Sequence, residues 1–592
     1  MPSSTGERLI PNDSKHDVVS LDVLINGTNV ATKHQILSVS VTKEVNRIPT
    51  AKVSIIDGNA ADETFAVSET SDFIPGNNIE IKAGRDGINK TIFKGIILKH
   101  SLKVRQGGDS MLSIEAKDEA IKLTVGRKNK YFEDVKDSDA ISTVLSALKG
   151  SVDATTVTHK EIVQFNATDW DFAMMRAEMN GLLVIPNDGK VDVKKPDTSS
   201  APVLNLTYGS DLLEFETEMD AQYQWSSVEA KAWDFSGQKL FESEATSAGS
   251  FTEHGNLSGK KLSDVLGLDK LELHHSGRVS EPELKAWAEA TILRSRMSKI
   301  RGRAKFIGFS DLKPGNTVSL RGLGARFNGK AYVTAVRHEV AAGTWFTHAQ
   351  FGLSPNFFYE KTDISAPPAG GLLPAVSGLQ IGIVSQLQED PDGEDRILVK
   401  MPLVNNAEKG IWARLATLDA GKERGTFFRP EIGDEVILGF VNDDPRDAVV
   451  LGMLHSSKLP TPEKAKDDNH IKGLVTRSKM KVVFDDDKKI ITIETPAGNK
   501  VVISEDEKSI TTTDQNGNES KMSKDGITVK SSKDVKIEAS GNVSIEAKGD
   551  VSIKGKNVKI EAQMNLEAKG SVNAKLEGGV QTVVKGAMVM IN

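Results

Sequence analysis

The residues of this chain whose types could perform chemistry are scattered and have few neighbours of the right kind. His338, Glu339 and His348 come closest to a metal site, because imidazole and carboxylate groups are common ligands of zinc. Their spacing is not His-Glu-x-x-His, and the sequence around them predicts two strands joined by a turn. We therefore interpret these three residues as an incidental cluster.

Three other features suggest a ligand site only superficially. His274 and His275 are adjacent, so a strand would direct them to opposite faces. The stretch 255–261 (GNLSGKK) is similar to a phosphate-binding loop, but it lacks the four-residue gap and has no Ser or Thr after the first lysine. Gly322-Leu-Gly324 lies between predicted strands and has no βαβ unit around it. We expect no metal and no bound cofactor.

The sequence also contains no arrangement typical of an enzyme. No Gly-x-Ser-x-Gly nucleophile elbow occurs. The segment 168–180 carries a stripe of aromatic and methionine side chains, which is typical of core packing in a helix. We therefore expect no catalytic residues. The stripe consists of Trp170, Phe172, Met174, Met175 and Met179.

Composition restricts the class of protein further. The 592 residues include no cysteine, which excludes disulfides and thiolate metal sites. The formal charge of −7 is spread through the chain, and no basic tract with interleaved aromatic residues indicates nucleic-acid binding. No apolar stretch is long enough to span a bilayer. The first residues, MPSSTGERLIPNDSKHD, have no apolar core, so we expect no ordinary signal peptide.

From Ile527 onward the chain repeats with a period close to eight residues. Apolar and polar residues alternate within each unit as in a strand, and Gly, Asn or Asp closes most units. A unit this small cannot bury its own apolar face, so stacked neighbours must supply the core. Three identical chains could each supply one face of a closed prism, and the repeat therefore predicts a trimeric β-helical rod. The units start at Ile527, Val535, Val543, Val551, Val558, Met564, Val572, Val580 and Met588.

The rest of the chain is predicted to be mainly β. Alternating segments around Gly and Asn turns predict two barrels, the second interrupted by a helix that opens with a capping box at Ser280–Glu283. Thr168 is the expected N-cap of a helix in an α/β insert. Five short strands in fewer than about 80 residues suit an OB fold. The expected parts are a flexible N-terminus (1–16), hub barrel 1 (17–130), the insert (131–202), hub barrel 2 (203–364), a Pro- and Gly-rich linker (365–378), the OB domain (379–457), a charged linker (458–470) and the β-helix spike (471–592).

The order of these parts resembles that of the valine–glycine repeat (VgrG) spike proteins of contractile injection systems, which correspond to a phage baseplate hub fused to a tail spike. The resemblance covers nearly the whole chain. Its most specific stretches are 168–193, 311–340 and 411–454. Within the last, the run Pro430–Val436 (PEIGDEV) and the turn Asp444-Pro445 are the most recognisable.

The resemblance implies a non-enzymatic homotrimer whose two barrels per chain form a pseudo-sixfold ring on a hexameric inner tube protein. The rod would point outward and carry a PAAR-repeat tip protein. Baseplate proteins, effector cargo and a transient membrane contact on piercing are further implied partners. The host could be a type VI secretion system, an extracellular phage-tail-like particle or a prophage tail. Such a protein would be made in the cytoplasm and then released or injected outside the producing cell.

Two departures from relatives narrow this expectation. Phage versions can carry a lysozyme-like domain between the small barrel and the rod, but only about 15 residues separate His455 from His470, too few for any enzyme domain. Some spikes end in a histidine-bound iron. The last histidine here is His470, so this chain cannot build that site.

The final ten residues, 583–592, become nearly continuously apolar. Three chains converging there would present a blunt hydrophobic surface with exposed strand ends. We expect this surface to dock the tip protein, although the same side chains could simply close the end of the prism. The docking residues are predicted to be Met588, Val589, Met590, Ile591 and Asn592.

Two other classes of protein use similar rods. A trimeric phage-tail or adhesin-type fibre would need a receptor-binding head, and it would leave the two barrels and the OB domain unexplained. A polysaccharide-degrading β-helix enzyme would need clustered Asp and Glu on one face, whereas the octads place single carboxylates beside lysines.

Overall fold

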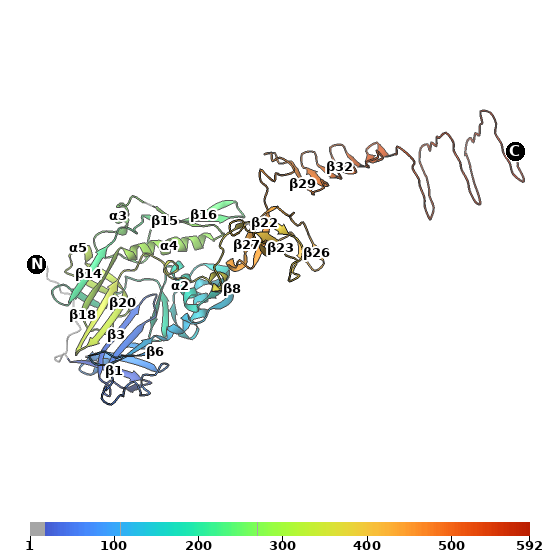
Figure 1. Ribbon diagram of the computed structural model, residues 1–592. Coiled ribbons are helices and arrows are strands. Elements are labelled where there is room, and N and C mark those ends of the chain that lie inside the picture. Colours follow the sequence, from blue (N-terminus) through green and yellow to red (C-terminus); the bar gives the residue numbers. More distant parts are fainter. Residues whose placement is uncertain (1–17, 107, 269, 406, 592) are drawn as a thin grey trace. The chain divides into compact units, whose positions relative to one another are not determined.

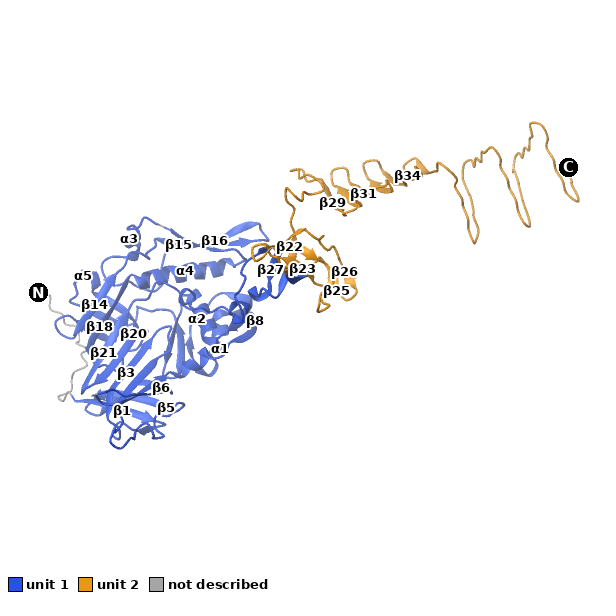
Figure 2. Cartoon of the chain, in the orientation of Figure 1, with its two compact units in different colours: residues 1–380, 411–414, 438–449 blue, residues 381–410, 415–437, 450–592 orange. Residues whose placement is uncertain are grey.

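The computed structural model describes residues 18–106, 108–268, 270–405 and 407–591 (Figure 1). The predicted flexible segment 1–16 lies outside the described residues. The chain divides into two compact units, drawn in different colours in Figure 2. No helix among the described residues is long and apolar enough to cross a membrane.

A 13-stranded sheet forms the basis of the first unit (Figure 1). Its strands come from both predicted barrels: β1 (Val19–Ile25), β2 (Thr28–Asn29), β3 (Ile36–Glu44), β4 (Thr50–Ile56), β5 (Asn78–Arg85), β6 (Ile88–Lys103), β7 (Met111–Lys117), β13 (Leu204–Thr207), β14 (Glu214–Met219), β18 (Ile300–Ile307), β19 (Thr317–Arg321), β20 (Gly329–Ala341) and β21 (Thr344–Phe351). The order is β14-β18-β21-β20-β3-β4-β7-β6-β5-β1-β2, with β19 on β20 and β13 on β19.

Antiparallel pairing of β3 with β20 joins the two halves of this sheet. The register runs from Glu44 opposite Ala335 to Ser38 opposite Ala341. The strands of both predicted hub barrels thus belong to one continuous sheet. Hydrophobic periodicity reports which face of a strand is buried but not which distant edge it pairs with, so this junction could not be predicted.

The alternating strands bury two apolar cores. The first contains Phe93 and Ile114 and also receives Trp345 from the β20–β21 hairpin. The second contains Phe306 and Phe351. Because β20 and β21 contribute to both cores, the hairpin fixes the two halves of the sheet to each other as well as pairing with β3.

The insert after β7 packs two helices on short strands. It contains β8 (Lys128–Lys136), β9 (Lys149–Val152), β10 (Thr158–Ala167), β11 (Leu183–Asn187), β12 (Lys190–Lys194), α1 (Asp137–Leu145) and α2 (Asp169–Met179). The predicted N-cap of α2 is confirmed, because the Thr168 hydroxyl accepts a hydrogen bond from the backbone N–H of Asp171 at 3.0 Å. Trp170, Phe172 and Met174 are buried as predicted, whereas Met175 is exposed.

A long helix and a three-stranded sheet interrupt the second half of the hub. Helix α4 (Glu281–Ser298) buries Leu284, Ala288 and Ile292 against β15 (Ser227–Asp234), which lies between β16 (Lys239–Ala245) and β17 (Lys270–His275). The predicted capping box is wrong, because the Ser280 side chain makes no capping hydrogen bond. The Glu283 carboxylate instead lies 3.4 Å from the Arg176 guanidinium of the insert.

Residues 380–453 contain the predicted five-stranded closed barrel. Its strands are β22 (Gln380–Gln386), β23 (Ile397–Lys400), β24 (Ile411–Leu415), β27 (Glu435–Phe440) and β28 (Ala448–Met453). The PEIGDEV run enters β27 through a turn in which Gly433 has a φ of +94°, a conformation that favours glycine. A short hairpin, β25 (Ala420–Gly421) and β26 (Arg424–Gly425), projects between β24 and β27.

The predicted rod begins as an antiparallel meander of seven five-residue strands (Figure 1). These are β29 (Ile471–Val475), β30 (Lys481–Asp485), β31 (Ile490–Glu494), β32 (Lys500–Ser504), β33 (Ser509–Thr513), β34 (Glu519–Ser523) and β35 (Gly526–Lys530). Residues 531–591 form no strand within the single chain that the structure describes. The remaining short helices are α3 (Gly259–Ser263), α5 (Gly324–Phe327), α6 (Phe358–Lys361), and the 3-10 turns Glu119–Thr124, Ser146–Leu148, Pro368–Gly371 and Val441–Asp443.

Candidate functional site

One face of the meander carries a continuous row of apolar side chains. Register pairs connect each member to the next across six consecutive strands, from β30 to β35. Their exposed fractions in the single chain run from 37% for Ile491 to 72% for Ile527. An exposed apolar row of this length marks a surface that another molecule covers. The row, called here the spike face, is Phe484, Ile491, Ile503, Ile510, Met522 and Ile527.

The apolar positions of the octads continue this pattern beyond β35. Val535, Ile537, Val543 and Ile545 are all exposed in the single chain. At the end of the rod, the predicted docking residues Met588 to Ile591 are between 48% and 89% exposed. The fifth predicted residue, Asn592, lies outside the described residues.

The histidines around the β20–β21 turn do not converge. The β20–β21 register sets His338 opposite Thr347 and Arg337 opposite His348, so the two imidazoles lie on opposite faces of the sheet. His338 is buried with its Nδ1 3.0 Å from the Thr347 hydroxyl, and burial lowers its pKa to about 3, which keeps it neutral at pH 7. His348 Nε2 lies 3.1 Å from the Glu339 carboxylate.

The other candidates also have structural partners. His274 lies 3.4 Å from the Glu272 carboxylate on the outer face of β17. In the 255–261 loop the backbone N–H of Gly259 donates to the Glu253 carboxylate at 2.7 Å, so the group that a phosphate would use is already occupied by an anion. Among the described residues, no group of three His, Asp or Glu is arranged to hold a metal ion.

A buried ionic network connects the insert to α4, and no sequence spacing indicated it. The Asp137 carboxylate accepts hydrogen bonds from Arg176 Nε at 2.5 Å, His159 Nε2 at 3.0 Å and Asn180 Nδ2 at 2.9 Å. Burial raises the pKa of Asp137, but the hydrogen bonds from His159 and Arg176 outweigh it and lower the pKa to about 2. Glu283, displaced from its expected capping role, completes the network beside Arg176.

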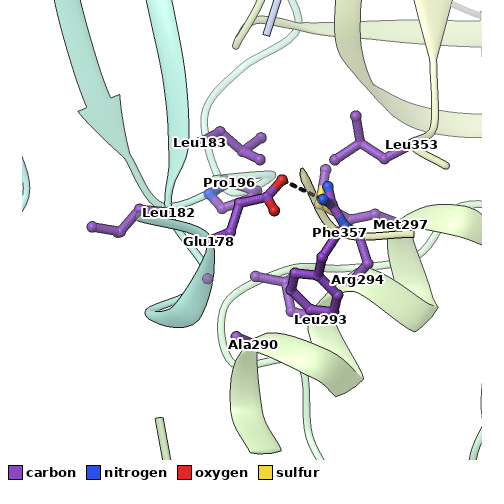
Figure 3. Close-up of a pocket in the computed structure, with 11 residues that line it drawn as sticks. Glu178, Leu182, Leu183, Pro196, Ala290, Leu293, Arg294, Met297, Leu353 and Phe357 are labelled. Carbon is purple, nitrogen blue, oxygen red and sulfur yellow. Dashed lines mark hydrogen bonds and ion pairs between the residues drawn. The ribbon is translucent and has the colours of Figure 1, made fainter. Parts of the chain in front are cut away.

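A second buried pair joins four segments of the first unit (Figure 3). Glu178 of α2 and Arg294 of α4 face each other and are only 6% and 8% exposed. The Glu178 carboxylate also accepts from Asn46 Nδ2 at 3.0 Å and from the backbone N–H of Phe358 at 2.6 Å. A small pocket beside this pair measures about 20 Å³, room for little more than a water molecule. This pair therefore holds the segments together.

Two family models match the chain. The Alg8 N-terminal domain matches residues 15–342, and the type VI secretion system/phage-baseplate injector OB domain matches residues 380–455. The second match covers the closed barrel and includes the PEIGDEV run.

Solved structures with similar folds include three from bacterial and phage tails and secretion systems. The 43 kDa tail protein of prophage MuSo2 from Shewanella oneidensis is 10% identical, with 57% of this chain and 98% of that chain covered and a TM-score of 0.44. The Escherichia coli c3393 protein, a component of the type VI secretion system, is 10% identical, with 74% of this chain and 99% of that chain covered and a TM-score of 0.34. One chain of the lidded Francisella PdpA-VgrG complex is 10% identical, with 86% of this chain and 80% of that chain covered and a TM-score of 0.37. Likenesses this distant add nothing to the argument.

The closed barrel and its family match together define residues 380–455 as an OB domain of the type VI secretion system/phage-baseplate injector kind. Because the first family model spans more than half of its length, the chain belongs to the Alg8 N-terminal domain family.

Because of the Asp137 network, part of the free energy of unfolding should depend on pH. The folded-state pKa of about 2 lies below the ordinary value of 3.8, so the stabilisation is complete above about pH 4 and is lost as the pH falls toward 2. We expect the stability difference between the wild type and Asp137→Asn, about 2 kcal/mol at neutral pH, to shrink over that window. Hydrogen exchange of α1 and α2 between pH 7 and pH 2.5 measures it.

The exposed Asp139, in the same helical turn, provides the matched control. Asp139→Asn should change the exchange of α1 and α2 little at any pH. A wild-type advantage over Asp137→Asn that stays constant down to pH 2.5 would contradict the role assigned to the network.

Proposed function

We propose that this chain is the non-enzymatic central spike and hub of a contractile injection system. In this role it joins the inner tube to a membrane-piercing tip and helps to deliver effector proteins into target cells. The observation that carries the proposal is the spike face, a register-aligned apolar row that a single chain leaves exposed. The match of residues 380–455 to a type VI secretion system/phage-baseplate injector OB domain supports the baseplate part of the proposal.

Two further copies of the chain are the proposed cover for the spike face. Burying a half-exposed isoleucine contributes roughly 1 kcal/mol, so the row from Phe484 to Ile527 favours association by several kcal/mol per chain. The backbone of the octads also favours association with other chains. Residues 531–591 form no strand within one chain, and unpaired backbone groups are costly once they are buried, so strand pairing in a packed rod must come from other chains.

Charges on the octads fit a solvated outer surface. Lys536 pairs with Glu538 and Lys559 with Glu561, and all four side chains are largely exposed. Exposed pairs of this kind contribute little to stability, so the apolar positions must supply the association energy. A trimeric prism with every strand paired would also resist the axial load of piercing better than isolated strands.

The hub is the proposed site of attachment to the hexameric inner tube protein and to baseplate proteins. Its continuous sheet carries strands from both halves of the chain, joined at β3 and β20, so three chains would offer six comparable segments. This count supports the expected pseudo-sixfold ring. The assembled apparatus would then release or inject the spike outside the producing cell.

The trimer can be tested on the full chain by replacing Ile503 and Ile510 with aspartate. Two charges per chain in the spike face would be buried without partners, so light scattering should find a trimer for the wild type and single chains of 64.0 kDa for the variant. Lys508→Asp is the matched control, because Lys508 is exposed in the turn between β32 and β33 and its φ of +50° is one that aspartate tolerates. A monomeric wild type would refute the proposal.

The end of the rod is the proposed docking surface for a PAAR-repeat tip protein. Met588, Met590 and Ile591 are at least 80% exposed in the single chain, and a tip protein would cover them and the free strand ends. Deleting 588–592, or replacing Met590 with aspartate, should abolish recovery of the tip protein in a pull-down while the trimer persists. Lys585→Asp should leave recovery unchanged. Normal recovery with both Met590→Asp and the deletion would show that these residues only close the prism.

Activity assays test the proposal that the chain is not an enzyme. The purified chain should show no turnover of peptidoglycan, phospholipid or nucleotides, because the candidate groups at His338, Glu253 and Asp137 already have internal partners. Turnover that survives high purity and disappears with one point substitution would overturn this part of the proposal.

A further inference from the structure

A second and larger cavity of the hub shares Glu178 and Arg294 with the small pocket described above. It measures about 740 Å³ and lies in the first unit, between the β3–β4 turn, the end of β7, α2, α4 and the segment around α6. Its charged lining consists of Glu44, Arg47, Lys117, Glu178, Arg294, Arg301 and Lys361. Five of these side chains are cationic and two are acidic, so the cavity carries an excess of positive charge.

The pairing of these charges leaves part of the excess without compensation. Glu178 pairs with Arg294, and Glu44 lies 3.4 Å from Arg47, while Arg301 pairs with carboxylates outside the cavity. Lys117 and Lys361 form no ion pair with any residue that the structure describes. The charge of Lys361 is therefore offset only at longer range, by Glu44 and Glu178, and Lys117 has no carboxylate within ion-pair distance among the described residues.

Two further observations indicate that the cavity favours binding of an anion. Burial lowers the pKa of Lys361, and the neighbouring cations Arg294 and Arg47 lower it further, which the carboxylates of Glu178 and Glu44 offset only in part. The buried Nε atoms of Arg294 and Arg301 donate no hydrogen bond to any described residue. A ligand with carboxylate groups would relieve the repulsion.

The lining favours a peptide over a phosphate compound. Partly buried apolar side chains, Ile48, Ile121 and Leu353, alternate with the charged groups. The cations stand on separate elements instead of converging on one point. The N–H at the start of α6, which a phosphate could use, already donates to Glu178 at 2.6 Å. Spaced carboxylates interleaved with apolar side chains match this arrangement better than one compact anion.

We propose that this cavity binds an extended acidic peptide segment, in which Asp or Glu side chains meet Arg47, Lys117 and Lys361 and apolar side chains meet Ile48, Ile121 and Leu353. The identification of that segment as part of a delivered effector rests on the proposed function. The binding itself follows from the charge and lining of the cavity alone.

The test uses the full-length chain and a fluorescently labelled peptide of alternating Asp and Leu, followed by anisotropy. Binding should weaken with salt. The double variant Arg47→Glu/Lys361→Glu should weaken it by about tenfold or more, since two attractive contacts become repulsive. Glu44→Gln should strengthen it, because a like charge is removed. The control Lys33→Glu/Lys103→Glu reverses two exposed charges that do not line the cavity and should leave binding unchanged.

Three results would overturn the inference: an alternating Lys-Leu peptide that binds equally well, binding that is indifferent to Arg47→Glu/Lys361→Glu, or no binding at all. Competition by inorganic tripolyphosphate at far lower concentration than by unlabelled peptide would identify a phosphate ligand and refute the peptide. Light scattering on the same samples separates the two proposals. A trimer that does not bind the peptide refutes only the cavity inference, whereas a monomer refutes the proposed spike.

Discussion

A short strand has one apolar face and nothing of its own with which to cover it, and this constraint applies to the meander and to the octads that follow it. In the meander the constraint is visible as a row that runs in register from Phe484 to Ile527. In the octads it extends to the backbone, which forms no strands within one chain. The proposed trimeric rod would be rigid only as an assembly, so its stability and its oligomeric state would be one property.

The hub solves a different problem, which is to hold distant segments of one chain in fixed positions. The β3–β20 pairing joins its halves, and buried ionic groups then join the inserts to the sheet. Glu178 connects α2 to Asn46, Arg294 and the backbone of Phe358. Buried ion pairs contribute little net stability because of desolvation, but removing one partner is costly, so they favour one specific arrangement over others.

Burial and internal partners also account for the polar groups that the sequence offered as candidate sites. His338 is kept neutral by burial, and Glu253 accepts from the loop that was similar to a phosphate site. In the acidic loop Glu389–Arg396 of the OB barrel, hydrogen bonds from Arg396 hold the pKa of Asp390 well below its usual range. A cation of the chain itself thus occupies the position where a metal would otherwise be considered. The hub cavity stands apart, because its Lys117 and Lys361 lack such partners among the described residues.

Local patterns in the sequence predicted most features that depend on neighbouring residues, and the capping box at Ser280–Glu283 is the exception. Alternation predicted the strands, Thr168 predicted the start of α2, and five short strands within 379–457 predicted the closed barrel. The completion of the rod by other chains and the docking role of Met588–Asn592 remain predictions. These patterns can be recognised in the sequence because strand period, capping and turn chemistry act over a few residues.

Only the tertiary structure decided which distant groups meet. It joined the two predicted barrels into one sheet and drew Glu283 from its capping box to Arg176. It also brought Glu178 to partners 132, 116 and 180 residues away and placed Lys117 and Lys361 in one cavity. Such contacts depend on how whole elements pack. A carboxylate that could cap its own helix pairs with a buried guanidinium instead, because leaving a buried charge unpaired costs more free energy than a helix cap contributes.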